Sequence, residues 1–248
     1  MNDCLVVIPA RLGSTRFPAK VLATLRGRPI VEWCRRAAVA AKVGPVVVAT
    51  DHVKVLHTVE YYGGEAVVTP PELASGTDRV WAVARERRAR FVINLQGDEP
   101  LIKPATIRKV AALLRERPGC DIATAVVPMA DKKRAEDPNV VKAAMGKNGR
   151  CLYFSRASIP FPRDAKSAGA SPFRYQHIGI YGFRYPALKR FVELPPSSLE
   201  KLECLEQLRA LEAGMTIFAV KVNDRTVAID TPGDMARAEK TLRILQNA

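Results

Sequence analysis

Short apolar runs alternate with amphipathic stretches through the first half of the chain, and this alternation limits the possible folds. The runs predicted as strands are 5–8, 45–50, 66–68, 91–95 and 122–127. The stretches predicted as helices are 30–42, 53–62, 77–88 and 106–116. Strands alternating with helices of this length predict an α/β fold with a mainly parallel, doubly wound sheet and right-handed crossovers.

The pattern changes between about 128 and 182. Short β-like pieces at 140–144, 150–154 and 176–182 are separated by loops rich in Pro and Ser. The segment is too short for a separate core, so we expect one domain over 1–248 with a β-rich insertion at about 128–182. Further helices are predicted over 187–193, 199–213 and 232–246, with a strand at 216–220.

Composition narrows the class of protein. The 248 residues are 48% hydrophobic, which is enough for one large core. No apolar run approaches the roughly 20 residues of a membrane-spanning helix, and the first strand leaves no room for a signal peptide, so we expect a cytoplasmic protein without membrane insertion. The five cysteines are scattered without a CxxC pair, which indicates reduced thiols.

The net charge of +14 permits nucleic-acid binding, because that binding depends largely on Lys and Arg. However, the cations are spread over helix faces, and aromatic residues are only 6% of the chain. No alternation of aromatic and basic residues typical of RNA-binding domains is present. We therefore expect a basic surface that attracts small anionic substrates, and no nucleic-acid partner.

The loop after the first strand, in VVIPARLGSTRFPAK, predicts a polyanion site. It carries Arg11, Ser14, Arg16 and Lys20. The first βα loop of an α/β sheet commonly holds phosphate groups, through backbone N–H groups and a helix N-terminus. The loop matches neither the P-loop nor the G-x-G-x-x-G motif. So many cations in one loop would repel one another without an anion, which argues against a merely solvated turn.

Two acidic positions predict a metal site. Asp98, in QGDEP, follows the predicted strand 91–95, and Asp230 follows the apolar segment 227–229, which we expect to be a strand. Carboxylates at strand ends face the crevice where ligands bind in α/β sheets, and Mg²⁺ takes one or two of them together with phosphate oxygens. An acidic turn or a helix N-cap would explain either residue as well.

Hydroxyl residues after other predicted strands are ambiguous. Ser75 and Thr77 open a predicted helix, and Thr50 with Asp51 follows the second strand. Such residues can cap a helix, or they can offer hydrogen bonds to a nucleobase or ribose.

The motifs VVIPARLGSTRFPAK, VATDH, SGTDR, NLQGDEP, YFSRASIP, HIGIYGF, LEQLR and DTPGD occur together and in order. The chain closely resembles the 3-deoxy-D-manno-octulosonate (KDO) cytidylyltransferases, or CMP-KDO synthetases, of lipopolysaccharide biosynthesis, from about residue 6 to 239. The resemblance implies a nucleotide-diphospho-sugar transferase-like fold and Mg²⁺ as cofactor. It also implies CTP and KDO as substrates, CMP-KDO and pyrophosphate as products, and a homodimer formed through the insertion.

The resemblance also implies residue roles. Arg11 and Lys20 would act on the triphosphate and, with the metal ligands Asp98 and Asp230, form the catalytic set. The nucleotide-binding residues would be Ala10, Arg11, Ser14, Arg16, Lys20, Thr50, Asp51, Ser75, Gly76, Thr77 and Gln96. The sugar-binding residues would be Arg156, His177, Tyr181, Glu206 and Gln207. From the residues alone, we would first interpret His177 and Tyr181 as core or edge residues, and the pair 206–207 as part of a polar helix face.

The chain departs from the family at one position. Where relatives usually continue DTPED, this chain has Gly233 before Asp234. A glycine there costs roughly 1 kcal/mol of helix propensity relative to Ala but leaves Asp230 in place, so we expect a local effect on stability and retained metal binding. Two alternatives remain open: activation of another sugar acid, such as 8-amino-KDO or a sialic acid, and nucleic-acid binding without catalysis.

Overall fold

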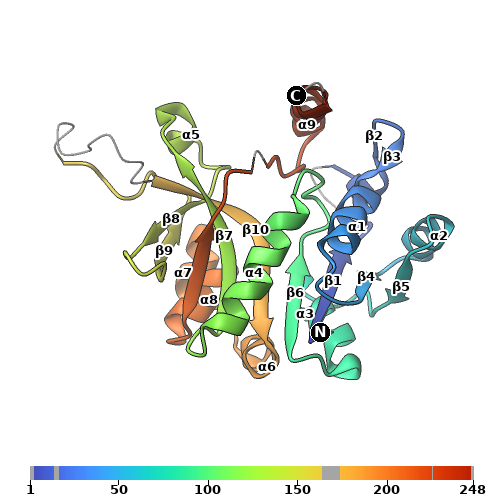
Figure 1. Ribbon diagram of the computed structural model, residues 1–248, viewed down its shortest axis with the longest axis horizontal. Coiled ribbons are helices and arrows are strands. Elements are labelled where there is room, and N and C mark those ends of the chain that lie inside the picture. Colours follow the sequence, from blue (N-terminus) through green and yellow to red (C-terminus); the bar gives the residue numbers. More distant parts are fainter. Residues whose placement is uncertain (1–2, 14–16, 164–173, 225, 247–248) are drawn as a thin grey trace.

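The computed structural model describes residues 3–13, 17–163, 174–224 and 226–246. A twisted central sheet organises the molecule (Figure 1). From one edge to the other its strands are β11 (Ile217–Lys221), β7 (Ile122–Met129), β10 (Arg174–Arg184), β6 (Phe91–Leu95), β1 (Cys4–Ala10), β4 (Val46–Thr50) and β5 (Glu65–Val68).

Along this order of seven strands, most neighbours are parallel, as predicted. β1 pairs with β4 and β6 in parallel, and the pairs β4–β5 and β7–β11 are parallel too. β10 is the exception, because it runs antiparallel to both β6 and β7. It also pairs with β8 (Lys142–Met145), which forms a hairpin with β9 (Cys151–Ser155). The segment predicted as an insertion therefore shares β10 with the central sheet.

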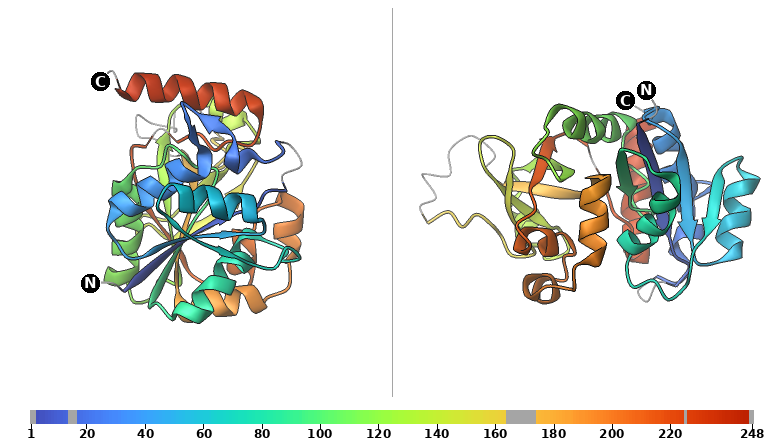
Figure 2. Two further views of the ribbon diagram at one scale, coloured as in Figure 1. Left: turned by 90° about the vertical axis from the view of Figure 1, so that its right-hand side faces the viewer. Right: turned by 90° about the horizontal axis from the view of Figure 1, so that it is seen from below.

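Helices cover both faces of the sheet (Figure 2). One face packs against α1 (Ile30–Ala41), α2 (Val53–Tyr61), α4 (Pro104–Glu116) and α9 (Pro232–Gln246), and the other against α3 (Gly76–Arg87), α6 (Tyr185–Glu193) and α8 (Gln207–Glu212). Side chains alternate between the faces of a strand. Accordingly, Val6 and Ile8 of β1 join the first core, and Leu5 and Val7 join the second. This confirms the doubly wound prediction.

The remaining short helices and strands lie in the connections between these elements. They are η1 (Lys20–Leu22), β2 (Thr24–Leu25), β3 (Arg28–Pro29), α5 (Lys132–Glu136) and α7 (Ser198–Glu203). Among the helices that the structure describes, none is long and apolar enough to cross a membrane.

Two of the predicted elements are wrong. The helix predicted over 199–213 is two helices, α7 and α8, because Cys204 adopts a left-handed conformation (φ 51°) that ends α7. The strand predicted at 227–229 is irregular backbone instead. A hydrogen bond of 2.9 Å from the Ile229 N–H to the Asp98 carbonyl holds this segment close to the end of β6. This bond brings Asp230 next to Asp98.

Candidate active site

A cavity of about 880 Å³ opens at the carboxyl ends of β1 and β6. Its walls come from the loop after β1, the end of β6, the start of α3, the segment from α6 to α8, and the residue before α9. The predicted residues that line it are Arg11, Lys20, Ser75, Gly76, Gln96, Asp98, Glu206 and Asp230. The fold thus collects side chains more than 200 positions apart around one space.

Lys20 joins the two predicted metal ligands. Its Nζ lies 2.6 Å from Asp98 Oδ2 and 2.8 Å from Asp230 Oδ1. Burial lowers the pKa of Lys20, but the two carboxylates outweigh burial and raise it above its ordinary value. The three side chains therefore form a charged cluster in which two carboxylates converge on one cation.

Gly97 sets the position of Asp98. A Cβ atom at Gly97 would lie 2.8 Å from the Pro9 carbonyl oxygen, closer than side-chain carbons approach backbone oxygens. A glycine therefore lets the chain leave β6 against β1 and turn Asp98 into the cavity.

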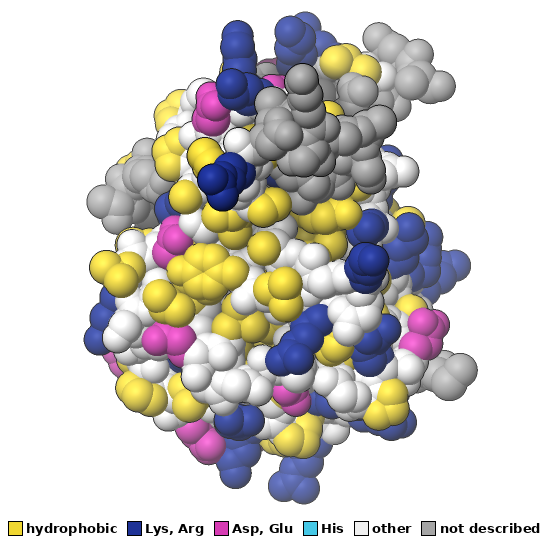
Figure 3. Space-filling model, turned by 90° about the vertical axis from the view of Figure 1, so that its left-hand side faces the viewer, with side chains coloured by type: hydrophobic (Ala, Val, Ile, Leu, Met, Phe, Trp, Pro, Cys, Tyr) yellow, Lys and Arg dark blue, Asp and Glu magenta, His cyan; other side chains and the backbone are white. Residues whose placement is uncertain are grey.

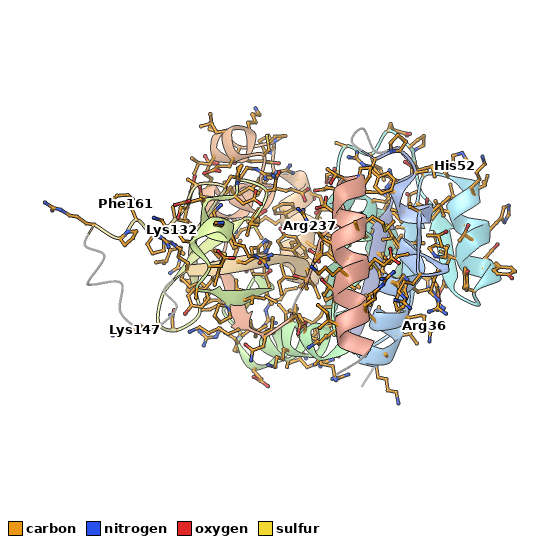
Figure 4. All side chains as sticks on the ribbon, turned by 90° about the horizontal axis from the view of Figure 1, so that it is seen from above. Arg36, His52, Lys132, Lys147, Phe161 and Arg237 are labelled. Atoms are coloured by element: carbon orange, nitrogen blue, oxygen red, sulfur yellow. The ribbon has the colours of Figure 1, made fainter. Side chains whose placement is uncertain are left out.

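Asp234 fixes the backbone at Asp230. One oxygen of Asp234 accepts hydrogen bonds from the N–H groups of Asp230 (3.1 Å) and Thr231 (2.8 Å), and the other pairs with Arg237. Burial raises the pKa of Asp234, but these hydrogen bonds and Arg237 leave it below its ordinary value. Figure 4 shows Arg237 on α9, seen from above. Asp234 is thus a structural anchor, in keeping with its place in the first turn of α9.

The start of α3, which we expect to bind the nucleotide, forms one wall of the cavity. Ser75 caps the helix: its hydroxyl accepts the Asp78 N–H (3.1 Å), while Asp78 accepts the Ser75 N–H (3.0 Å). Behind it, Gln96 Nε2 donates to Asn94 Oδ1 (2.9 Å), and Asn94 Nδ2 donates to the Thr77 hydroxyl (3.3 Å). The expected cap is present, and Ser75 still faces the cavity.

Other predicted nucleotide residues lie behind the wall. Ala10, Thr50, Asp51 and Thr77 do not line the cavity. Asp51 instead fixes the loop after β1, because its Oδ1 accepts the Leu12 N–H at 2.9 Å. Thr50 accepts the His52 N–H at 3.2 Å. Ser14 and Arg16 fall outside the described residues, so their roles stay predictions.

Glu206 lines the cavity, and Gln207 follows it at the start of α8; both are predicted to bind the sugar. Glu206 Oε2 accepts a hydrogen bond of 2.7 Å from Thr77, and Gln207 Oε1 accepts one of 3.1 Å from the Tyr181 hydroxyl. Glu206 Oε1 and Gln207 Nε2 are buried and have no hydrogen-bond partner among the described residues. Burial raises the pKa of Glu206. Buried polar atoms without partners are rare, and their presence here indicates a ligand that completes the hydrogen bonding.

His177 is a core residue in this structure. Its Nε2 lies 2.9 Å from the Thr124 hydroxyl, and its ring packs between Phe154 and Tyr181. Burial lowers its pKa to about 3, so the ring is neutral at physiological pH. Neither His177 nor Tyr181 lines the cavity, and neither does Gln207 or Arg156. Contact of these four residues with a sugar therefore stays a prediction.

Two arginines that line the cavity escaped the sequence prediction. Arg79 lines the cavity and its guanidinium lies 3.8 Å from Asp51. Arg209, in the quoted motif LEQLR, also lines it and pairs with Glu200 through two contacts of 2.6 and 2.8 Å. Arg209 could have been identified from its place in that motif.

Glu99 lies beside the charged cluster. Its Oε1 accepts the Gly179 N–H at 3.3 Å, and its Oε2 has no hydrogen-bond partner among the described residues. Burial, and to a smaller extent the charge of Asp98, raise its pKa to about 8. The neighbouring residues of the QGDEP motif thus differ: Asp98 pairs with a cation, and Glu99 holds its proton at neutral pH.

Comparisons with known proteins identify the family. The family model described as cytidylyltransferase matches residues 5–217. The 3-deoxy-manno-octulosonate cytidylyltransferase of Elusimicrobium minutum is 46% identical over 98% of this chain and 99% of its own length, and that of Paramagnetospirillum magneticum is 44% identical over 96% and 97%.

A solved structure is similar over nearly the whole fold. It is a CMP:2-keto-3-deoxy-manno-octonic acid synthetase complexed with CTP, which superposes with a TM-score of 0.90 at 36% identity and covers 97% of this chain and 98% of its own. With relatives this similar along almost their full length, the chain belongs to the cytidylyltransferase family, among the 3-deoxy-manno-octulosonate cytidylyltransferases.

Proposed function

We propose that this protein transfers CMP from CTP to the anomeric hydroxyl of KDO, giving CMP-KDO and pyrophosphate for lipopolysaccharide biosynthesis. The anomeric oxygen would attack the α-phosphorus, and the bond from that phosphorus to the leaving pyrophosphate would break. The observation that carries the proposal is the cluster of Lys20, Asp98 and Asp230 in a cavity that is also lined by Glu206, whose Oε1 has no hydrogen-bond partner among the described residues. The names of the near-full-length relatives support the same substrates.

The cluster fits a divalent metal. Enzymes of this family generally use one, and Mg²⁺ is the ion we propose. Asp98 and Asp230 already converge on a single cation, and both offer the oxygen ligands that Mg²⁺ prefers. The described residues contain no group of three or more His, Cys, Asp or Glu side chains able to hold a metal, so substrate oxygens would have to complete the ligand set. When bound, Mg²⁺ neutralises charge on the reacting phosphate groups.

The cations would serve the triphosphate. Lys20 sits between the carboxylates and, once a metal takes them, its ammonium group is free to move to a phosphate oxygen. Arg11 lines the same cavity and is exposed, so its guanidinium could bind the β- and γ-phosphates and stabilise the departing pyrophosphate. Ser75, Gly76 and Gln96 would hold the cytidine from the opposite wall.

Glu206 and Gln207 would hold the hydroxyl groups of the acceptor. Their unpartnered buried atoms are one acceptor and one donor, which suits a polyol. Tyr181 keeps Gln207 in place through its hydroxyl. A sugar bound here would satisfy both atoms at once.

A substrate panel tests the proposed function. Purified protein with CTP and Mg²⁺ should release pyrophosphate with KDO, and much more slowly with 8-amino-KDO or a sialic acid. Asp98→Asn and Asp230→Asn should lose turnover while remaining folded, and Lys109→Met, an exposed change on α4, should behave as the wild type. Turnover with another acid but none with KDO would contradict the proposal.

We also propose that two copies associate through the face that bears β8 and β9. Figure 3 shows apolar side chains gathered at the centre of that face with Lys and Arg around them. Leu152 on β9 and Phe161 beyond it are 61% and 84% exposed. Large exposed apolar residues that cluster mark interaction surfaces. Leu152→Asp should convert a dimer into a monomer in light scattering, and a wild-type monomer would refute this arrangement.

Cytoplasmic location and the absence of a nucleic-acid partner remain predictions.

A further inference from the structure

Asn94 is a polar residue in a strand that is otherwise apolar. All five residues of β6 are buried, and Val92 belongs to the core that α3 covers. Because side chains alternate along a strand, Asn94 points to the same face of the sheet as Val92. A buried amide costs free energy unless its hydrogen bonds are made, and an apolar side chain at this position would avoid that cost. The presence of Asn94 here therefore points to a role for its hydrogen bonds.

Both ends of the Asn94 amide are occupied. Its Oδ1 accepts a hydrogen bond of 2.9 Å from Gln96 Nε2, and its Nδ2 donates one of 3.3 Å to the Thr77 hydroxyl. Thr77 is buried as well, and its hydroxyl donates to Glu206 Oε2 at 2.7 Å. These four side chains form one continuous hydrogen-bond network from the end of β6 through α3 to the start of α8, which we call the Asn94 network.

The network fixes the direction of the Thr77 hydroxyl. An amide nitrogen only donates, so Thr77 accepts from Asn94 and directs its own proton to Glu206 Oε2. This bond occupies one oxygen of the carboxylate. The other oxygen, Oε1, is buried and has no hydrogen-bond partner among the described residues. Asn94 and Thr77 together therefore determine which oxygen of Glu206 is left for a ligand.

The two ends of the network lie at the cavity, and its middle does not. Gln96 and Glu206 line the cavity, whereas Asn94 and Thr77 are not among its lining residues. Any effect of the two middle residues on a bound ligand would therefore pass through the two side chains at the ends. A displacement of about 1 Å at a group that binds substrate is enough to reduce activity strongly.

The residue next to Glu206 is held from the same pair of strands. Tyr181 of β10 lies opposite Asn94 in the register of β6 and β10, and its hydroxyl donates to Gln207 at 3.1 Å. The start of α8 is thus tied to two adjacent strands of the central sheet. One tie runs through Asn94 and Thr77 to Glu206, and the other runs directly from Tyr181 to Gln207.

We propose that Asn94 and Thr77 are positioning residues that hold Glu206 so that its Oε1 faces the acceptor sugar. The proposal rests on the proposed function and adds to it two residues that act without lining the cavity. It gives Thr77, which opens α3 beside the expected nucleotide residues, an effect on the sugar that passes through Glu206.

Kinetics of Thr77→Val test the role of the hydroxyl. The change keeps the branched shape of the side chain and removes the bond to a charged partner, so it should raise the KM for KDO about tenfold. The KM for CTP should stay within about twofold of the wild type. Thr77→Ser keeps a hydroxyl and should restore the KM for KDO. An unchanged KM for KDO in Thr77→Val, or a Thr77→Ser variant as impaired as Thr77→Val, would overturn the proposal.

Thr216→Val is the matched control. It also removes a threonine hydroxyl that donates to a carboxylate, that of Asp121, at 2.9 Å. Both residues precede their strands, β11 and β7, at the end of the sheet opposite to the carboxyl end of β6. This variant should keep the KM for both substrates. A rise in the KM for KDO equal to that of Thr77→Val would show a general effect of lost stability and would overturn the positioning role.

Asn94→Asp tests the direction of the network. The carboxylate still accepts from Gln96, but it replaces the donor to Thr77 with a second acceptor, which competes with Glu206 for the hydroxyl proton. The KM for KDO should therefore rise as in Thr77→Val, with the KM for CTP within about twofold of the wild type. An unchanged KM for KDO would contradict the fixed direction. Thr77→Val, which buries no new charge, decides the proposal if Asn94→Asp does not fold.

Crystal structures without substrates separate this proposal from the proposed function. In Thr77→Val, the Glu206 carboxylate should move by more than about 1 Å from its place beside residue 77, while the cap formed by Ser75 stays in place. An unmoved Glu206 would overturn the positioning role even if the wild type makes CMP-KDO. A displaced Glu206 would support it even if the wild type proved inactive with KDO.

Discussion

Lys20→Met tests the charged cluster at the centre of the site. In the protein without ligands, Lys20 Nζ binds Asp98 and Asp230 at 2.6 and 2.8 Å, with side chains that are 14%, 23% and 42% exposed respectively. Buried charged hydrogen bonds contribute about 1.5–3 kcal/mol each, and exposed ion pairs less than about 1 kcal/mol. For partly exposed groups we expect the variant to lose about 1–3 kcal/mol without metal. For a chain of this size that lowers Tm by roughly 2–12 °C.

Mg²⁺ should reverse part of that loss. In the wild type a metal must displace Lys20 from both carboxylates, whereas in Lys20→Met the carboxylates repel one another until a cation arrives. A ligand that binds the folded state stabilises it in proportion to its affinity. The gain in Tm on adding Mg²⁺ should therefore be larger for Lys20→Met than for the wild type.

Turnover should stay low even where Mg²⁺ restores part of the stability. Without the ammonium group on the leaving phosphates, Lys20→Met should lose about 10²–10³-fold in kcat. Thermal unfolding with increasing Mg²⁺, together with pyrophosphate release, measures both. Lys109→Met is the control for loss of a surface charge. An equal Mg²⁺-dependent rise in Tm for the variant and the wild type would refute the competition between lysine and metal.

Three further changes test the supporting structure. Gly97→Ala should cost about 1–3 kcal/mol, because its Cβ would meet the Pro9 carbonyl oxygen at 2.8 Å; an unchanged urea midpoint would refute the close approach. Gly233→Ala should add about 0.5–1 kcal/mol and leave metal binding unchanged, because its Cβ would meet only Thr231 Oγ1, at 3.7 Å; a lower stability in urea would count against this. The pKa of His177 is about 3 in the folded protein, against a reference value of 6.5 for the unfolded chain. As the pH falls below 6.5, the unfolded chain therefore binds a proton at this residue before the folded protein does. Wild-type stability should therefore decline toward acid pH more steeply than that of His177→Gln, by about 1.4 kcal/mol per pH unit in urea unfolding, and parallel pH profiles would contradict the neutral buried ring.

The sequence predicted best where a local pattern decides the structure. β6 and α9 have the predicted bounds because a short, largely apolar run and a proline-led first turn mark them locally. The antiparallel direction of β10 is set by its partners β6 and β7, which periodicity does not reveal. Cys204 breaks the helix predicted over 199–213 in a left-handed conformation that favours glycine, so the sequence carried no signal for it.

The same limit applies to the candidate site. Charge and position at strand ends predicted that Lys20, Asp98 and Asp230 belong together, and the structure places them in contact. For Asp230 the predicted cause was wrong. The hydrogen bond from the Ile229 N–H to the Asp98 carbonyl, and not a strand, holds Asp230 next to Asp98. Arg156 showed only a charge in the sequence. Its guanidinium donates to three backbone carbonyls from two separate segments, and only the folded chain brings these together.

The most direct test of the proposed reaction uses KDO labelled with heavy oxygen at the anomeric hydroxyl, incubated with CTP, Mg²⁺ and the protein. Attack by that oxygen on the α-phosphorus predicts CMP-KDO that keeps the label in the bridge between sugar and phosphorus, with unlabelled pyrophosphate in equal amount. Mass spectrometry of both products reads the result. Absence of labelled CMP-KDO, or label in the pyrophosphate, would contradict cytidylyl transfer to KDO by this protein.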